Sequence, residues 1–161
     1  MIYFTSFIFT LLLAHVARAV PACDDVAAPQ EIYDSEEPLL ATYKVTWDAT
    51  YDKPNGNTNS VACSNGPHGL AAKYPHFKDF HDFPYLGGAF DVKWGSPNCG
   101  KCWKLTDKKT HRFFYFTAID STSPGFNIGK KAFIDLNGGT IGAGTLEAEA
   151  ISVPKHFCGF K

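Results

Sequence analysis

The sequence lacks several features that mark particular classes of protein: a second long apolar run, glycosylation sequons, repeats and a strong net charge. After the first 19 residues, no apolar run approaches the roughly 20 residues that a membrane-spanning helix needs. The chain has no Asn-X-Ser/Thr sequon, internal repeat or low-complexity tract, so we expect neither N-glycosylation nor a repeat architecture. A formal net charge of -1 over 161 residues also excludes a strongly basic nucleic-acid arm.

What the chain has in quantity is apolar and aromatic bulk. Hydrophobic residues make up 45% of it, and it contains 14 Phe, 7 Tyr and 3 Trp. A disordered tail or a collagen-like repeat does not have this composition. The length and the apolar content predict one ordinary domain with its own core.

The first 19 residues have the pattern of a secretory signal peptide. The apolar run from Phe4 to Val16 is too short to span a bilayer, and the small-X-small triplet Ala17-Arg18-Ala19 follows it. We therefore expect cleavage after Ala19 and a secreted, extracellular or wall-associated protein.

Residues 20–41 predict an acidic flexible spacer or propeptide. Between Val20 and Leu40 there are six acidic residues, three prolines and no Lys or Arg. Residues 41–161 then hold 14 basic and 10 acidic residues, a balance of 14 - 10 = +4. This mild positive charge suits adsorption to anionic walls or lipids and is too small to predict nucleic-acid binding.

Four cysteines of the domain predict two disulfides, because thiols of a secreted chain are oxidised. They are Cys63, Cys99, Cys102 and Cys158, and their spacing leaves all three pairings open. The fifth, Cys23, lies in the spacer.

The segment Cys99-Gly100-Lys101-Cys102 has the spacing of a redox dithiol or half a zinc site. A redox dithiol needs a helix after it, whereas the residues that follow, Trp103 to Thr106, favour a strand. A zinc site needs a second close Cys or His pair, and the six His are scattered. We predict neither a metal nor a cofactor.

Local patterns predict several short strands and two short helices. Strands are expected over residues 42–50, 112–119 and 144–153, the second of them buried on both faces. Helices are expected over residues 69–74 and 128–136, with Asn127 capping the start of the second and Asn137-Gly138-Gly139 ending it. Together these elements suggest a closed β-barrel.

Strings of residues spread through positions 42–161 resemble one known family. They include Val45–Asp48, Cys63–Gly66, Ser96–Leu105, Ala118–Asp120, Gly125–Ile128, Asp135–Gly139 and Cys158–Gly159. In these strings the domain resembles the cerato-platanins, which are secreted fungal proteins. Trp47 stands where Tyr is more usual, and the acidic spacer with Cys23 is outside the family pattern.

The resemblance implies a mainly β fold with short helices, a six-stranded double-psi β-barrel shared with expansins. It implies that Cys63 pairs with Cys99 and that Cys102 pairs with Cys158. Cys23 is then left without a partner inside the domain, which raises the prospect of a disulfide-linked dimer.

Two carboxylates are candidates for chemistry. Hydrolysis of a glycosidic bond ordinarily needs a pair of carboxyl groups flanking that bond. Asp120 at the end of a predicted strand and Asp135 near the end of a predicted helix resemble the acids of related barrels. The resemblance nevertheless implies no catalytic residue, because the family binds chitin oligomers and loosens cellulose without appreciable hydrolysis.

A sugar ring has an apolar C–H face and polar edges, so a binding site needs flat aromatic surface and fixed polar groups. Trp103, between a disulfide cysteine and a strand, is expected in the core. Four other aromatics are candidate platforms, and three polar residues are candidate hydrogen-bonding partners: Trp47, Tyr51, Tyr74 and Trp94, with Asp48, Asp120 and Asn127.

The resulting hypothesis is a secreted, non-enzymatic protein that binds chitin or cellulose-type polysaccharide. It would loosen wall polysaccharide in an expansin-like way and be recognised by a host as an elicitor or allergen. One alternative is a weak wall hydrolase using Asp120 and Asp135. Another is a surface-active protein that exposes aromatic residues.

Overall fold

A computed structural model describes residues 40–161, which form a closed six-stranded barrel. The predicted signal peptide, most of the spacer and Cys23 lie outside the described residues. The strands are β1 (Ala41–Asp48), β2 (Leu86–Ala89), β3 (Lys101–Asp107), β4 (Phe113–Ser121), β5 (Phe126–Gly129) and β6 (Leu146–Val153).

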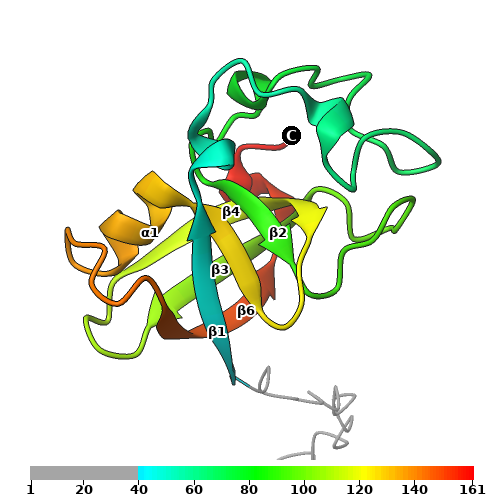
Figure 1. Cartoon of the computed structure of the whole chain (residues 1–161). Helices are drawn as coiled ribbons and strands as arrows, with labels where there is room; N and C mark the ends of the chain where they lie inside the picture. Colours follow the sequence, from blue (N-terminus) through cyan, green and yellow to red (C-terminus); the bar gives the residue numbers. More distant parts are fainter. Residues whose placement is uncertain (1–39) are drawn as a thin grey trace, which may run out of the picture. The chain divides into compact units, whose positions relative to one another are not determined.

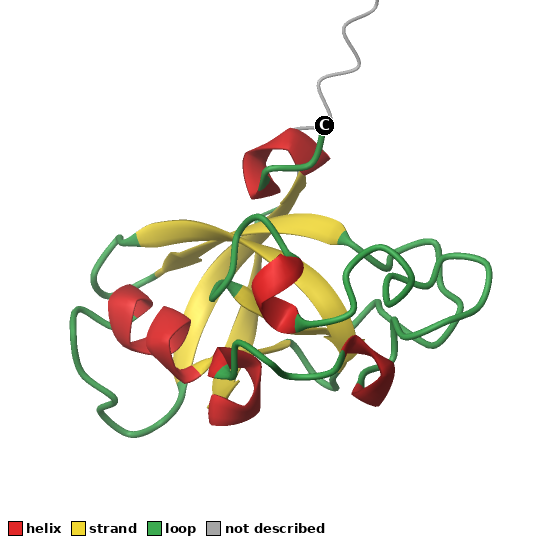
Figure 2. Ribbon diagram, turned by 90° about the horizontal axis from the view of Figure 1, so that it is seen from above, coloured by secondary structure: helices red, strands yellow, loops and turns green. Residues whose placement is uncertain are grey.

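The strands close in the order β1-β5-β2-β4-β3-β6 (Figure 1). β1 runs parallel to β5 and β2 runs parallel to β4, whereas the remaining four pairs are antiparallel. The closed, mainly β fold expected from the resemblance is therefore confirmed. Its wall is built almost wholly from strands, as Figure 2 shows, and no helix within residues 40–161 is long and apolar enough to cross a membrane.

Alternation along the strands fills the barrel. Val45, Leu105, Phe116 and Phe126 point inward and are fully buried, and neighbouring positions face outward. β2 contains Gly87, where an added Cβ would lie 2.5 Å from a β5 carbonyl oxygen, so β2 and β5 could not pair as they do with a side chain there. The barrel core is thus a set of interdigitated apolar side chains.

A second apolar cluster lies under the long connection between β1 and β2. This connection includes η1 (Ala49–Asp52), η2 (Thr58–Ser60) and η3 (Phe77–Asp79), and Figure 1 shows it looping over one end of the barrel. Its cluster joins the connection to the outer side of β2 and β4 and consists of Tyr51, Val61, Tyr74, Phe77, Phe80, Leu86 and Ile119.

Both disulfides confirm the pairing implied by the resemblance. Cys63 is bonded to Cys99, and Cys102 is bonded to Cys158 in η4 (Lys155–Cys158). Cys99 and Cys102 are therefore joined to different distant partners, so they do not form a dithiol with each other.

Both helix predictions need correction. Residues 69–74 contain no helix and form a turn at 71–73, because Pro75 has no N–H and disfavours helical backbone at the residue before it. The predicted 128–136 helix begins later, as α1 (Lys130–Leu136), with Gly129 as N-cap. Asn127 does not cap it, because residues 126–129 pair with β1 and β2 instead.

The strand predicted over residues 112–119 is β4, but it is not buried on both faces. Phe113 at its start is 55% exposed, and Phe114 and Tyr115 are half-buried. Burial is complete only from Phe116 to Ile119, where the long connection covers the outer side of the strand.

Candidate functional site

Asp120 is held at the end of β4 by three hydrogen-bond donors. The Tyr51 hydroxyl donates to Oδ2 over 3.0 Å, and the backbone N–H groups of Ala62 and Ser121 donate to Oδ1 over 2.9 Å and 2.8 Å. The side chain is half-buried. A carboxylate offers about four acceptor positions, so about one remains for a ligand.

Tyr51 lies beside Asp120, but its ring is buried and is not an exposed platform for a sugar. It is 5% exposed and belongs to the second apolar cluster, so its contribution is the hydroxyl. Burial and the charge of Asp120 raise the pKa of Tyr51 well above its ordinary value, with a smaller effect from Asp48. Asp48 is exposed and accepts a hydrogen bond from Thr50 N at the start of η1. Asp48 and Asp120 are therefore linked through η1, which Asp48 caps and from which the Tyr51 hydroxyl donates to Asp120.

Asn127 is linked to Asp120 across a single glycine. Gly88 of β2 pairs with Asn127 on one side and with Asp120 on the other. The Asn127 side chain accepts a hydrogen bond from the Thr46 hydroxyl, at 3.1 Å.

Trp47, the next residue along β1 after Thr46, packs against the barrel core, with the Lys130 ammonium 5.3 Å from its ring centre. The structure does not bring Trp47 to Asp120.

A shallow hollow of about 390 Å³ lies along residues 59–72 of the long connection between β1 and β2. Asp120 does not line this hollow, but it binds the backbone of the segment that does. The lining consists of Asn59, Ser64, Asn65, Gly66, Gly69, Ala71 and Ala72.

The aromatic candidates differ sharply in exposure. Tyr74 is 5% exposed and stacks on Phe80, so its ring is not available to a sugar. Trp103 is 6% exposed, which confirms it as a core residue. Trp94 is 65% exposed, and its indole N–H donates to Asn65 Oδ1 over 2.9 Å.

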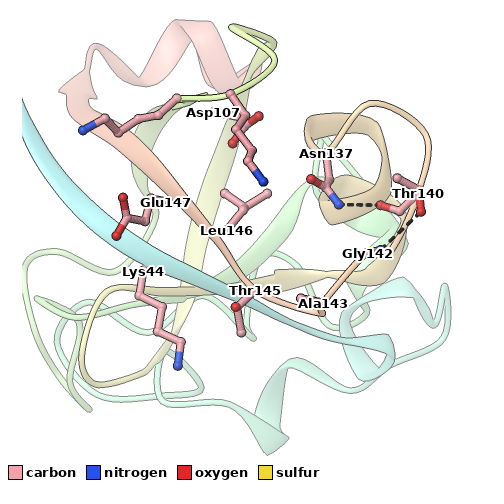
Figure 3. A pocket seen from close by; sticks show the side chains of 11 residues that line it. Lys44, Asp107, Asn137, Thr140, Gly142, Ala143, Thr145, Leu146 and Glu147 are labelled. Carbon is pink, nitrogen blue, oxygen red and sulfur yellow. Dashed lines mark hydrogen bonds between the residues drawn. The ribbon is translucent and has the colours of Figure 1, made fainter.

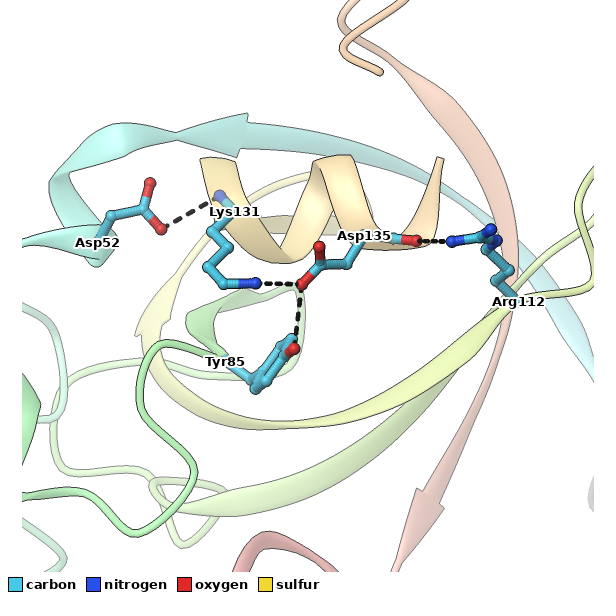
Figure 4. A network of polar contacts seen from close by, with 5 residues as sticks. All are labelled: Asp52, Tyr85, Arg112, Lys131 and Asp135. Atoms are coloured by element: carbon cyan, nitrogen blue, oxygen red, sulfur yellow. Dashed lines mark hydrogen bonds and ion pairs between the residues drawn. The ribbon is translucent and has the colours of Figure 1, made fainter. Parts of the chain in front are cut away.

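Asp135 belongs to a separate polar network on α1 (Figure 4). Its Oδ2 accepts from the Lys131 ammonium at 2.6 Å and from the Tyr85 hydroxyl at 3.0 Å. Burial by itself would raise the pKa of Asp135, but these hydrogen bonds outweigh it and hold the pKa below its ordinary value. Asp52 Oδ1 accepts from the Lys131 backbone N–H and so caps the helix.

This arrangement is poorly suited to acid catalysis. A general acid needs a carboxyl whose pKa is raised toward the working pH, and that of Asp135 is lowered. No described residue is hydrogen-bonded to both Asp120 and Asp135. Residues 40–161 contain no cluster of three or more His, Cys, Asp or Glu side chains that could hold a metal ion.

A larger cleft, which the sequence did not predict, opens near the start of β4, at the opposite end of that strand from Asp120 (Figure 3). We call it the far cleft. It has a volume of about 690 Å³ and no aromatic side chain in its lining. Its charged residues are Lys44, Asp107, Lys108, Lys109 and Glu147. They come from β1, β3, β6 and the turn after β3, so only closure of the barrel brings them together.

Asp82 is a perturbed carboxyl that sequence reasoning also missed. Its Oδ2 accepts from the Thr117 hydroxyl at 2.7 Å, and its Oδ1 is buried with no hydrogen-bond partner. Burial raises the pKa of Asp82 to about 7, although the hydrogen bonds to it act in the opposite direction. No local motif marks this residue, because the long connection folding over β4 is what buries it.

Comparison with known proteins agrees with the barrel fold. The cerato-platanin family model matches residues 43–160. This chain belongs to the cerato-platanin family. The match covers all of the barrel strands except the first two residues of β1, and it contains both disulfides.

Similar family members include one named as an allergen and one named as a fungal elicitor. The allergen Asp f 15 of Aspergillus fumigatus is 42% identical over 125 residues, which are 76% of this chain and 80% of that protein. Cerato-platanin 2 of M. perniciosa has a TM-score of 0.70 at 33% identity, covering 74% of this chain and all of that one. The fungal elicitor Cerato-Platanin has a TM-score of 0.64 at 35% identity, and the match covers 71% of this chain and 95% of that one.

Proposed function

We propose that this chain is a secreted, non-enzymatic protein that binds oligomers of N-acetylglucosamine. The observation that carries this proposal is the half-buried carboxylate of Asp120, fixed by three donors and flanked by Asn127. A fixed acceptor with one open position suits a sugar hydroxyl, because little order is lost when the ligand binds. Asp48, exposed beside Tyr51, supplies a second acceptor.

The proposal extends to the loosening of chitin or cellulose-type walls without cutting them. Binding that exchanges chain–chain hydrogen bonds for protein–chain ones shifts the wall toward separated chains and needs no catalytic base. The lowered pKa of Asp135 and its separate network support this route over hydrolysis. Recognition by a host as an elicitor or allergen is part of the proposal, because relatives carry those names.

Titration with chitohexaose, followed by residue-level NMR and a reducing-sugar assay, tests the proposal. We expect shifts at Asp120, Ala62 and Asn127 and no release of reducing ends. Asp120→Asn should weaken binding about tenfold or more, because a charge-assisted hydrogen bond is lost. Glu147→Gln in the far cleft is the matched control and should bind as the unaltered chain does.

Three results would contradict the proposal in different ways. A flat titration with every chitin oligomer would exclude sugar binding. Release of reducing sugar that Asp120→Asn or Asp135→Asn abolishes would establish the hydrolase instead. If Glu147→Gln weakens binding and Asp120→Asn leaves it unchanged, the binding site lies in the far cleft instead.

A surface-active role is a second candidate, favoured by exposed aromatic residues on the outside of the barrel. Phe113 and Phe157 are 55% and 46% exposed, and Phe157 stacks on Tyr115 with ring centres 4.9 Å apart. An exposed apolar patch of this kind adsorbs to air–water or lipid surfaces. If this role is correct, the unaltered chain should lower surface tension and Phe113→Ser with Phe157→Ser should abolish that lowering. No lowering by the unaltered chain would exclude the role, and lowering that survives both changes would exclude these two rings as its cause.

A further inference from the structure

Trp94 is an exposed ring held in a fixed position. Its indole N–H donates to Asn65 Oδ1 over 2.9 Å, and the ring edge lies against Gly66. Gly66 has a φ of +88°, and a Cβ there would lie 3.3 Å from the ring, so glycine is needed for both the turn and the contact. The ring is 65% exposed and held by a hydrogen bond, so it presents a fixed aromatic face to solvent.

The hollow next to this ring has the chemistry of a site for an uncharged ligand. Asn65 and Gly66 line the hollow and also contact Trp94. The other lining groups are the Asn59 amide, the Ser64 hydroxyl and small residues, and none carries a charge. Its volume of about 390 Å³ falls within the range of about 300–1,000 Å³ usual for small-molecule sites. The far cleft, by contrast, contains three lysines.

The hollow is attached to the barrel at Cys63 and braced within itself. The disulfide between Cys63 and Cys99 ties the segment before Asn65 to the segment after Trp94. Cys63 N donates to the Ile119 carbonyl over 3.0 Å, and Ala71 N donates to the Ser64 carbonyl over 2.9 Å. The site therefore needs little reorganisation to bind a ligand.

The hollow is also connected to Asp120 through one short segment. Ala62 N donates to Asp120, and the next three residues lead directly to Asn65. A ligand that is a linear chain of similar units could therefore contact Asp120 with one unit and the Trp94 ring with another.

We propose that Trp94 and this hollow form a second subsite, which takes an N-acetylglucosamine unit of the same oligomer that contacts Asp120. The inference rests on the proposed function. Trp94 stacks on the apolar face of the sugar ring, and Asn59 and Asn65 hydrogen-bond its polar edge. Ala71 and Ala72 supply apolar surface for the acetamido methyl group, which a glucose unit lacks.

Affinity measured against oligomer length tests the subsite. In calorimetric titrations of the full chain, chitohexaose should bind more tightly than chitobiose. Trp94→Ala should weaken chitohexaose binding about tenfold and leave chitobiose binding unchanged, because in this proposal a chitobiose occupies the Asp120 site alone and only a longer oligomer also contacts the ring. Trp94→Phe should restore most of the affinity for chitohexaose. Phe113→Ala, at the far end of β4, is the matched control for an exposed aromatic ring and should have no effect.

The outcomes separate the subsite from the proposed function. If Trp94→Ala binds chitohexaose as tightly as the unaltered chain, while Asp120→Asn does not, the subsite is wrong and the proposed function stands. If the unaltered chain binds no oligomer, both are wrong. Equal binding of chitohexaose and cellohexaose would overturn the assignment of the acetamido group to the hollow.

Discussion

At the scale of single residues, Tyr51 is the support of Asp120. Its ring is buried, and its hydroxyl donates to the carboxylate at 3.0 Å. Because burial and the Asp120 charge raise the pKa of Tyr51, the hydroxyl keeps its proton and remains a donor throughout the physiological pH range. From the sequence, Tyr51 is predicted to be a platform for a sugar ring. Only its burial in the structure shows that it positions Asp120 instead.

We predict that Tyr51→Phe will lower the free energy of unfolding by about 1 kcal/mol and weaken binding of chitin oligomers. The phenyl ring keeps its packing, so the change isolates the hydroxyl. Urea denaturation and calorimetric titration measure the two effects. Stability that falls while affinity stays constant would show that Asp120 is held well enough by Ala62 and Ser121 alone.

Asp82 gives the protein a pH-dependent stability. The pKa of this carboxyl is about 7 in the folded chain and 3.8 ordinarily, so between about pH 4 and 7 the folded chain holds a proton that the unfolded chain releases. The free energy of unfolding therefore falls as the pH rises through this window, by up to about 1.4 kcal/mol per unit.

We predict that Asp82→Asn will remove this slope. The variant should match the unaltered chain in stability near pH 4 and exceed it at pH 8, because no buried charge forms. Urea denaturation at pH 4.5, 6 and 8 measures the difference. Parallel stability curves for the two proteins would contradict the prediction.

At the scale of elements, residues from elsewhere in the chain stabilise α1 by hydrogen bonds at its first turn and on its exposed side. Asp52 of η1 caps its first turn, and Tyr85 reaches Asp135 near its end. The hydrophobic spacing correctly predicted a helix ending near residue 136. Its start was mispredicted, because β1 offers the residues before Lys130 a pairing partner that no local pattern reveals.

We predict that Asp135→Asn will lower the free energy of unfolding by less than about 1 kcal/mol and leave oligosaccharide binding intact. The Lys131 and Asp135 side chains are 57% and 40% exposed, and ion pairs at such positions contribute little. Thermal unfolding and oligomer titration check both parts. A loss of binding as large as that of Asp120→Asn would return Asp135 to the site.

At the scale of the whole molecule, the disulfides should contribute unequally to function. Cys63–Cys99 and Cys102–Cys158 close loops of 36 and 56 residues, and each should add about 4 kcal/mol to stability. Only the first bond ties the walls of the Trp94 hollow together.

We predict that replacing either pair by serine will lower stability comparably, whereas replacing Cys63 and Cys99 will also weaken chitohexaose binding. Guanidinium denaturation, and titration under conditions where each variant is folded, measure the two effects. Equal affinity in both variants would show that the hollow does not depend on its disulfide.

The sequence by itself determined the family, through strings of residues that resemble it, and that resemblance implied the six-stranded barrel, the disulfide pairs and the two carboxylates worth testing. The spacing of the cysteines alone left all three pairings open. Only the tertiary structure decided that Trp94 is exposed while Tyr51 and Tyr74 are buried, that Asn127 faces Asp120 across Gly88, and that Asp135 lies in another network. The reason is physical: burial and hydrogen-bond partners depend on which distant strands pair and in what register, and residue type alone does not specify this.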